Sequence, residues 1–225
     1  MNKRQEQLLK LVVESHISTA EPVGSKFLVS DAGLDLSEAT VRNELRVLEE
    51  EGFLSHPHTS AGRMPTVAGY KHYLKSNDFS KAKLSEKENI VLNSAKSSSD
   101  KKEVLKNFAK AVVEISGQTV LIAFSRDSVY YTGLVNLFSQ PEVRELNISA
   151  DISLMFDRCE ECVEKFYDIA EDAPKFYISD EHSFGEILSV GAFKFGDGSI
   201  FALLGPVRMN YKKNYAILNK AKETI

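Results

Sequence analysis

The sequence predicts an α+β protein with two domains, and three observations lead to this prediction. Apolar residues recur at helical spacing up to Gly52 and are separated by turn residues. Short strand-like stretches alternate with helical ones in the last part of the chain. Between these parts lies a polar stretch rich in lysine and serine, 77–103, which predicts a linker with one short helix. We therefore expect one domain at 1–76 and a second at 104–225.

Composition limits what the chain can be. It has 225 residues, 43% of them hydrophobic and 27% charged, and a formal net charge of −4. In residues 1–75, nine Lys or Arg stand against ten Asp or Glu, which argues against a protein that binds any polyanion through its total charge. No apolar run approaches the ~18 residues of a membrane span, and the N-terminus lacks the apolar core of a signal peptide. Two cysteines without a secretion signal favour a reducing compartment, so we expect a cytoplasmic protein with no membrane partner.

Four helices are predicted in the first domain, the last of them at 67–76. The first covers 3–17 and the second covers 24–33, each with apolar residues on one helical face. The third, 36–51, has both ends specified. Ser37 can accept a backbone N–H of its first turn, and Gly52 can adopt the left-handed conformation that ends a helix. Two helices followed by a third that can enter a DNA groove is the order of a helix-turn-helix module.

The third predicted helix has two different faces. Val41, Leu45 and Leu48 form an apolar stripe at helical spacing. The opposite face is small near its start and then carries two guanidinium groups and an amide, the groups that read base edges in a DNA major groove. The residues of this face are Ala39, Arg42, Asn43 and Arg46. The acids at 49–51 oppose the helix dipole and would repel phosphates, so the N-terminal half is expected to enter the groove.

A short hairpin is predicted directly after this helix. Strand-like stretches at 53–56 and 63–66 flank the turn sequence PHTSAG. Pro65 fits only an edge strand, as in the wing of a winged helix, whose tip lies along the DNA backbone or minor groove. From residue 52 to residue 75 the chain has one arginine, two lysines, three histidines and no acid. The sequence therefore predicts a winged helix-turn-helix domain at the N-terminus.

The second domain is expected to mix helices with antiparallel strands. The strongest local signal is Gly196-Asp197-Gly198, which is typical of a tight hairpin turn rather than a phosphate-binding loop. Strands are expected at 119–124, 129–134, 176–178, 190–195 and 199–204, and helices at 104–116, 152–169 and 211–221.

Several motifs carry a resemblance to a known family. They are TAEPVGS at 19–25, LSEATVRNELRVLEEEGFL at 36–54 and HPHTSAGRMPTVAGYKHYL at 56–74. Together they resemble the winged-helix domain of HrcA, the heat-inducible transcription repressors of bacteria, and the SAGR-x-PT wing is highly distinctive. Near the C-terminus, TGLVNLFSQPEVRE at 132–145 and LLGPVRMNYKKNYAIL at 203–218 are similar to later motifs of the same family.

The resemblance implies a repressor that binds an inverted-repeat operator upstream of chaperone genes as a homodimer and is released by heat. It also implies a GAF-like α+β regulatory domain. That this domain is a docking module for a chaperonin that modulates the repressor is a further alternative. Family members usually have a long stretch, including an inserted dimerisation domain, between the helix that ends near Ser116 and the TGLVNLF motif. Here about fifteen residues separate the two. We therefore expect a reduced GAF-like domain that dimerises through its apolar strands and the segment 203–215.

The third helix and the wing together give a candidate DNA interface. Its side chains are expected to face bases or the flanking phosphates. The two arginines of the helix are the expected guanine readers, Asn43 reads adenine and Ala39 contacts a thymine methyl. Arg63 is expected to contact the DNA backbone from the wing. The complete set is Ser37, Ala39, Thr40, Arg42, Asn43, Arg46, His58, Thr59, Ser60 and Arg63.

Three other interpretations stay open. Each arginine of the helix can instead pair with an acid one turn away, Arg42 with Glu38 and Arg46 with Glu50. The GAF-like domain can hold a small molecule that sets DNA affinity, which only a convergent polar pocket would favour. Three histidines can form a metal sensor, although no cysteine or carboxylate clusters with them in the sequence. These histidines are His56, His58 and His72.

The two cysteines carry no predicted site. Cys159 and Cys162 form a lone C-x-x-C on a predicted helix, without the second ligand pair of a structural zinc site. They also lack the strand-to-helix context of a redox site, so we expect two reduced, half-buried thiols. No catalytic constellation is present, and we expect no cofactor and no enzymatic activity.

Overall fold

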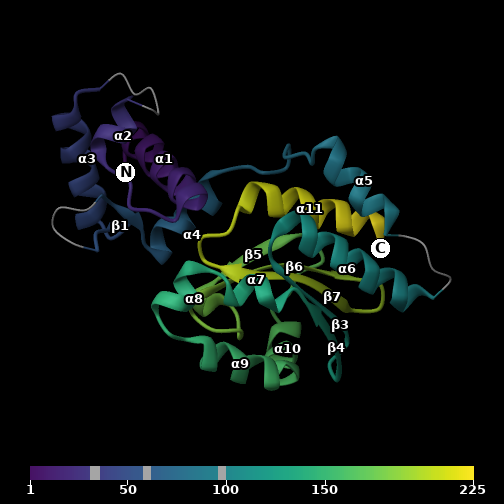
Figure 1. Cartoon of the computed structure of the whole chain (residues 1–225). Coiled ribbons are helices and arrows are strands. Elements are labelled where there is room, and N and C mark those ends of the chain that lie inside the picture. The colour runs from purple at the N-terminus through teal and green to yellow at the C-terminus, as the bar shows by residue number, and fades with distance from the viewer. Residues whose placement is uncertain (31–35, 58–61, 96–99) are drawn as a thin grey trace. The chain divides into compact units, whose positions relative to one another are not determined.

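The structure is a computed structural model. The chain forms two compact units, Met1–Asp78 and Phe79–Ile225. Each unit is described by itself, with the element labels of Figure 1. The residues that the structure describes are 1–30, 36–57, 62–95 and 100–225.

The first unit consists of helices and a two-stranded antiparallel hairpin (Figure 1). Its helices lie where the apolar spacing predicted them, and the strands pair Leu54 with Pro65 and Ser55 with Met64. The elements are α1 (Lys3–Thr19), α2 (Ser25–Ser30), α3 (Glu38–Glu50), β1 (Leu54–Ser55), β2 (Met64–Pro65) and α4 (Val67–Ser76).

The ends of α3 confirm the predicted caps. The Thr40 backbone N–H donates to Ser37 Oγ at 3.1 Å, which satisfies one free donor of the first turn. Gly52 has a φ of +81°, the left-handed conformation that glycine adopts without strain. The stripe Val41, Leu45 and Leu48 is buried and faces the apolar side of α1. Burying each of these side chains contributes about 1.5–3 kcal/mol, so packing fixes which face of α3 meets solvent.

The hairpin is attached to the rest of the first unit through its backbone. Val23 and Arg63 exchange two hydrogen bonds, N–H to carbonyl, of 2.9 Å each. A Cβ at Gly62 would lie 2.5 Å from the Val23 carbonyl carbon, and a Cβ at Gly69 would lie 2.3 Å from the Phe53 carbonyl oxygen. Only glycine permits such close approach, so these two positions let the hairpin lie against its neighbours.

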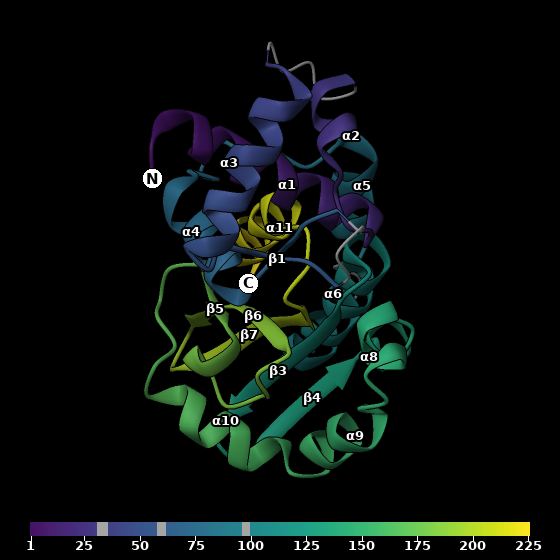
Figure 2. The same ribbon diagram turned by 90° about the vertical axis from the view of Figure 1, so that its left-hand side faces the viewer.

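The second unit is built on a five-stranded antiparallel sheet with the order β4-β3-β7-β6-β5 (Figures 1 and 2). Helices lie on both of its faces. The strands are β3 (Thr119–Ser125), β4 (Ser128–Thr132), β5 (Lys175–Ile178), β6 (Leu188–Phe195) and β7 (Ser199–Pro206). The helices are α5 (Glu86–Ser94), α6 (Lys101–Ser116), α7 (Leu134–Phe138), α8 (Pro141–Glu145), α9 (Ser149–Asp157), α10 (Cys159–Tyr167), the short 3₁₀ helix η1 (Ser179–Glu181) and α11 (Tyr211–Thr224).

Two cores lie on opposite faces of this sheet. One includes residues of α5, α6 and α11, and the other includes residues of α7 to α10. Along β3, Val120 and Ile122 belong to the first core, while Leu121 and Ala123 belong to the second. Successive side chains of a strand point to opposite faces, so a sheet covered on both sides needs continuous apolar strands. The α+β prediction is confirmed for this unit.

The stretch expected to form a linker, 77–103, is not a separate segment in the structure. Most of its described residues belong to the second unit. Within it, α5 packs on α6, and the Leu92 side chain of α5 is fully buried in the sheet core. The polar composition of the stretch hides this contact, because one or two apolar residues are enough to hold a short helix on a surface.

Three expectations for the second unit differ from the structure. The helix expected at 152–169 is two helices, since the backbone of Arg158 leaves the helical region between α9 and α10. α7 and α8 lie after β4, where we predicted no helix; the one local signal was Pro141, which starts α8. The segment 203–215 was expected to expose a dimer surface, but Leu203, Leu204 and Tyr211 are fully buried inside the unit.

None of the helices in the described part of the chain has the length and apolar character that a membrane crossing requires.

Candidate nucleic-acid interface

The face of α3 opposite its buried stripe is open to solvent. Ala39, Arg42, Asn43 and Arg46 are exposed, as is the N-cap Ser37. The side chains of the two arginines are 68% and 62% exposed. The structure therefore brings these predicted residues together on one accessible helix face. Thr40, the remaining predicted residue of α3, is half-buried, and its hydroxyl is hydrogen-bonded to Ser37 Oγ at 2.9 Å.

Arg42 is held by two neighbours at the start of α3. Its Nη2 donates to Glu38 Oε1 at 2.5 Å, and its Nε donates to Ser25 Oγ at 3.3 Å. The Ser25 hydroxyl in turn donates to Glu38 Oε1 at 3.1 Å. Ser25 is the first residue of α2, so this small network also joins α2 to α3. No local signal in the sequence points to Ser25, because it is 17 positions away from Arg42.

Arg46 pairs with Glu50, with Nη1 2.7 Å from Oε1. The alternative interpretation, that each arginine pairs with an acid one turn away, is thus confirmed for both. These pairs are solvent-exposed, and exposed pairs at this spacing contribute only about 0.3–0.5 kcal/mol. Such a pair is weak enough for a phosphate or a base edge to replace the carboxylate. The pairing therefore leaves both arginines able to bind a ligand.

The opposite side of α3 is anchored to α1. Glu44 accepts hydrogen bonds from Arg4 Nη1 at 3.1 Å and from Gln5 Nε2 at 3.0 Å. Gln5 also accepts from the backbone N–H of Asn2, which caps α1. The charged groups of α3 thus divide into an exposed face and a set that fixes the helix in the unit.

Arg63 differs from the arginines of α3. Its Nε is inaccessible to solvent and lies 2.7 Å from Glu49 Oε2, and the two side chains are only 23% and 22% exposed. The other Glu49 oxygen is hydrogen-bonded to His56 Nδ1. We predicted that Arg63 would contact DNA from the hairpin, and the structure places it against the last turn of α3. The other predicted hairpin residues, His58, Thr59 and Ser60, lie outside the described residues.

The described histidines of the first unit contact carboxylates and hydroxyls. His56 contacts Glu49, and His72 Nε2 lies 2.9 Å from Glu6 Oε2. His16 Nδ1 is 2.7 Å from the hydroxyl of the buried Tyr70. Within the described ranges, the structure has no group of three or more His, Cys, Asp or Glu side chains placed to hold a metal ion.

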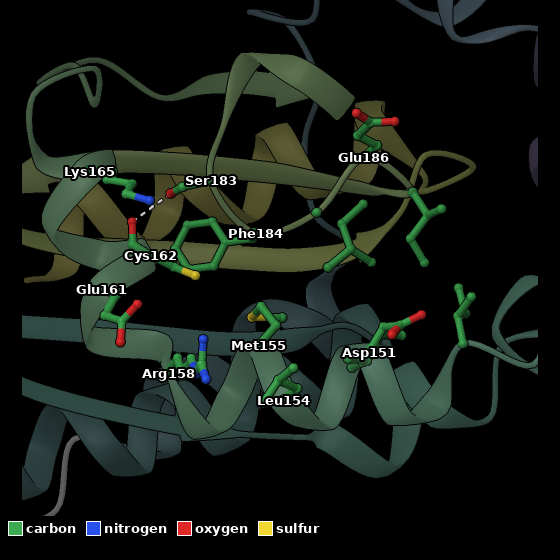
Figure 3. Close-up of a pocket in the computed structure, with 15 residues that line it drawn as sticks. Asp151, Leu154, Met155, Arg158, Glu161, Cys162, Lys165, Ser183, Phe184 and Glu186 are labelled. Carbon is green, nitrogen blue, oxygen red and sulfur yellow. Dashed lines mark hydrogen bonds between the residues drawn. The ribbon is translucent and has the colours of Figure 1, made fainter.

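The second unit has a cavity of about 430 Å³ between α9, α10 and the loop before β6 (Figure 3). Its apolar wall includes Ile152, Met155 and Phe184. Its charged side chains are all exposed: Asp151, Arg158, Glu161, Lys165 and Glu186. The hydroxyl of Ser183 donates to the Cys162 carbonyl oxygen at 2.5 Å. Because charged side chains lie only where solvent reaches them, this is not the convergent polar pocket that a ligand sensor would favour.

The C-x-x-C cysteines lie beside this cavity on α10. Both are free; Cys159 is buried and Cys162 is half-buried. Burial raises the pKa of Cys159 to about 11, and burial also raises the pKa of Cys162. A thiol with a raised pKa carries little thiolate near neutral pH and is a poor nucleophile and metal ligand. Of the two reduced, half-buried thiols expected, Cys162 is half-buried and Cys159 is more deeply buried than predicted.

Comparison with known families decides where the chain belongs. A model described as the HrcA protein C terminal domain matches residues 67–214, which is more than half of the chain. The chain belongs to the HrcA family. The matched residues include α4 and nearly all of the second unit, while α3 and the hairpin precede them.

Relatives of this HrcA-family chain match over part of their length. A "Heat-inducible transcription repressor HrcA" of Mycolicibacterium smegmatis is 35% identical over 137 residues, 60% of this chain and 40% of the relative. A protein of the same description from Cutibacterium acnes is 53% identical over 74 residues, 33% of this chain and 22% of the relative. The chain thus spans less than half the length of these relatives.

One solved structure shares the fold over the whole chain. It is described only as a hypothetical protein at 2.2 Å resolution, and it has a TM-score of 0.79, 17% sequence identity, and coverage of 100% of this chain and 97% of that chain. At this identity the likeness shows the fold alone.

Proposed function

We propose that this chain is a sequence-specific DNA-binding repressor of heat-shock (chaperone) genes, which binds an inverted-repeat operator as a homodimer. The observation that carries the proposal is the exposed face of α3, where Ala39, Arg42, Asn43 and Arg46 lie together over a buried apolar stripe. The names of the two relatives support the same function. A repressor of this kind works in the cytoplasm, next to DNA, and needs no catalytic site.

In this proposal the first unit is a winged helix-turn-helix domain and α3 is its recognition helix. α3 places its N-terminal half in the major groove, where the positive end of the helix dipole meets the phosphates. Arg42 and Arg46 exchange their carboxylate partners for guanine edges, Asn43 reads adenine and Ala39 contacts a thymine methyl. Ser37 and Thr40 lie at the N-terminus of the helix, next to the flanking phosphates.

A homodimer explains how so small a unit can select one operator. A single module buries about 600–1,000 Å² on DNA, and tight discrimination needs two modules on two half-sites. We assign the dimer contact to the second unit, a reduced GAF-like domain, because it exposes large apolar side chains. Val135, Leu146 and Leu154 are 77%, 60% and 51% exposed. A chaperonin that modulates the repressor would dock on the same unit.

Footprinting tests the proposal. The full chain, added to DNA from the upstream regions of its own chaperone genes, is expected to protect an inverted repeat. Sedimentation of the chain with that duplex is expected to give two chains for each repeat. Uniform binding to all duplexes, or protection of a single half-site by one chain, would contradict it.

A further inference from the structure

The Glu49 carboxylate joins the last turn of α3 to His56 and Arg63, which flank the two strands of the hairpin; we call these two contacts the tie. Glu49 Oε2 lies 2.7 Å from Arg63 Nε, and Glu49 Oε1 is hydrogen-bonded to His56 Nδ1. His56 directly follows β1, and Arg63 directly precedes β2. The tie therefore acts at the residues that flank the paired strands.

Both side chains of the Glu49–Arg63 pair are largely shielded from solvent, whereas the arginines of the other α3 ion pairs are 52%, 68% and 62% exposed. The side chains of Glu49 and Arg63 are 22% and 23% exposed, whereas those of Arg46 and Glu50 are 62% and 59% exposed. Removing one partner of a shielded pair leaves the other charge without compensation, which costs far more than breaking an exposed pair. Two backbone hydrogen bonds to Val23 fix the main chain of Arg63, so its guanidinium can move toward DNA only if the side chain rotates away from Glu49.

We propose that Glu49 is a positioning residue that fixes the hairpin against the recognition face of α3. Arg63 then serves DNA binding through this tie rather than by contacting phosphate. The inference rests on the proposed function and deepens it. α3 and the hairpin then approach DNA as one rigid surface. The base contacts of α3 and the contacts of the hairpin with the DNA backbone form together. The conformational entropy of the hairpin is lost during folding and not on DNA binding.

Whether removal of the Glu49 charge weakens or tightens DNA binding distinguishes the positioning role from simple electrostatic repulsion. Replacing an acid near DNA by its amide removes repulsion from the phosphates and should tighten binding. Loss of a positioning contact should weaken binding. Glu49→Gln is therefore expected to weaken binding of the full chain to its footprinted operator by about tenfold. The matched control is Glu51→Gln, the same charge change two residues on at an exposed side chain, with affinity unchanged or slightly higher. Equal or tighter binding by Glu49→Gln would overturn the proposal.

A double-mutant cycle and a salt titration test the part played by Arg63. Arg63→Gln is expected to weaken binding about as much as Glu49→Gln, and the double variant no more than either alone, because all three remove the same tie. The slope of log affinity against log salt should stay at the wild-type value. A slope reduced by about one unit in Arg63→Gln would show a direct phosphate contact and overturn the proposal.

Amide hydrogen exchange tests the tie without DNA. In Glu49→Gln, the Val23 and Arg63 amides, bonded to each other's carbonyls at 2.9 Å, should exchange about tenfold faster, while amides in the middle of α3 keep their rates. Unchanged rates for Val23 and Arg63 would overturn the proposal. Loss of protection throughout α3 would mean that Glu49 supports the fold as a whole; the shorter Glu49→Asp then repeats the test, and the same loss there would also overturn it. If the wild-type chain protects no operator, the proposed function fails while this measurement still decides the tie.

Discussion

Two groups of charged contacts on α3 differ mainly in how much solvent reaches them. Arg42–Glu38 lies on the open face, with the arginine side chain 68% exposed. Arg63–Glu49 lies under the hairpin, with both side chains less than a quarter exposed. An exposed pair is weak and can exchange its partner, whereas a shielded pair keeps its geometry. The comparison shows that exposure divides arginines of one unit into those whose carboxylate partner can be exchanged and one that its partner holds in place.

The largest effect is expected from the apolar stripe, which supports both groups. Leu48 is fully buried, so Leu48→Ala should lower the free energy of unfolding by about 2–5 kcal/mol. Urea denaturation followed by circular dichroism measures this loss. Val47→Ala, at a half-buried neighbour on the same turn, should cost less. An equal loss for the two variants would show that the stripe is not what orients α3.

The next effect concerns base reading by the exposed group. Arg42→Ala should lose roughly 1–3 kcal/mol of binding free energy at the operator and barely change binding to random duplex. Competition binding at fixed salt gives both values. Equal weakening on the two duplexes would place Arg42 on phosphate and remove it from the base readers.

The comparison extends to an ion pair of the second unit whose side chains are partly exposed to solvent. Glu88 of α5 pairs with Lys213 of α11 at 2.7 Å, with side chains 22% and 34% exposed. Its hydrogen bonds with Lys213 and Ser85 lower the pKa of Glu88 from 4.5 to about 2. The stabilisation should therefore be complete above pH 4.5 and lost as the pH falls toward 2. Unfolding curves over this range should show a loss of roughly 1 kcal/mol, limited by solvent screening, that Glu88→Gln abolishes. The same pH slope in Glu88→Gln would assign the loss to other carboxyls.

The smallest effect is expected from the exposed acid beside Arg42. Glu38→Gln should change the free energy of unfolding by no more than about 0.5 kcal/mol, since its pair is exposed. The same substitution frees Arg42 and removes a negative charge near DNA, so operator binding should become slightly tighter. Thermal unfolding and competition binding check both results. A loss of unfolding free energy larger than about 1 kcal/mol would mean that the exposed network stabilises the fold as much as the shielded pair does.

Local features of α3 could be predicted from the sequence because their causes lie within one or two turns. The N-cap Ser37, the glycine after the helix and the buried stripe each depend on neighbours in the chain. The pairing of Arg42 with Glu38 followed from the same short spacing. For the same reason the exposed residues of the candidate site could be named before the structure was known.

Contacts between distant residues could not be predicted in this way. Glu49 and Arg63 are separated by the end of α3 and by β1, so the sequence alone predicts only a charge that repels phosphate. The burial of Leu203 and Leu204 depends on helices that cover both faces of the sheet, which no single strand reveals. The split of the helix at Arg158 has no glycine or proline to mark it.

The buried Leu92 has a consequence for how far apart two half-sites can be. Because α5 belongs to the second unit, the chain runs from the end of α4 at Ser76 to the start of α5 at Glu86 in only nine residues, 77–85. Fully extended, they reach about 30 Å, whereas a free stretch of 27 residues would reach about 90 Å. In the proposed dimer, so short a connection would make each chain selective for the distance between half-sites as well as for their bases. The affinity of the chain for operators with inserted base pairs should fall abruptly once the added length exceeds what two such connecting segments can span.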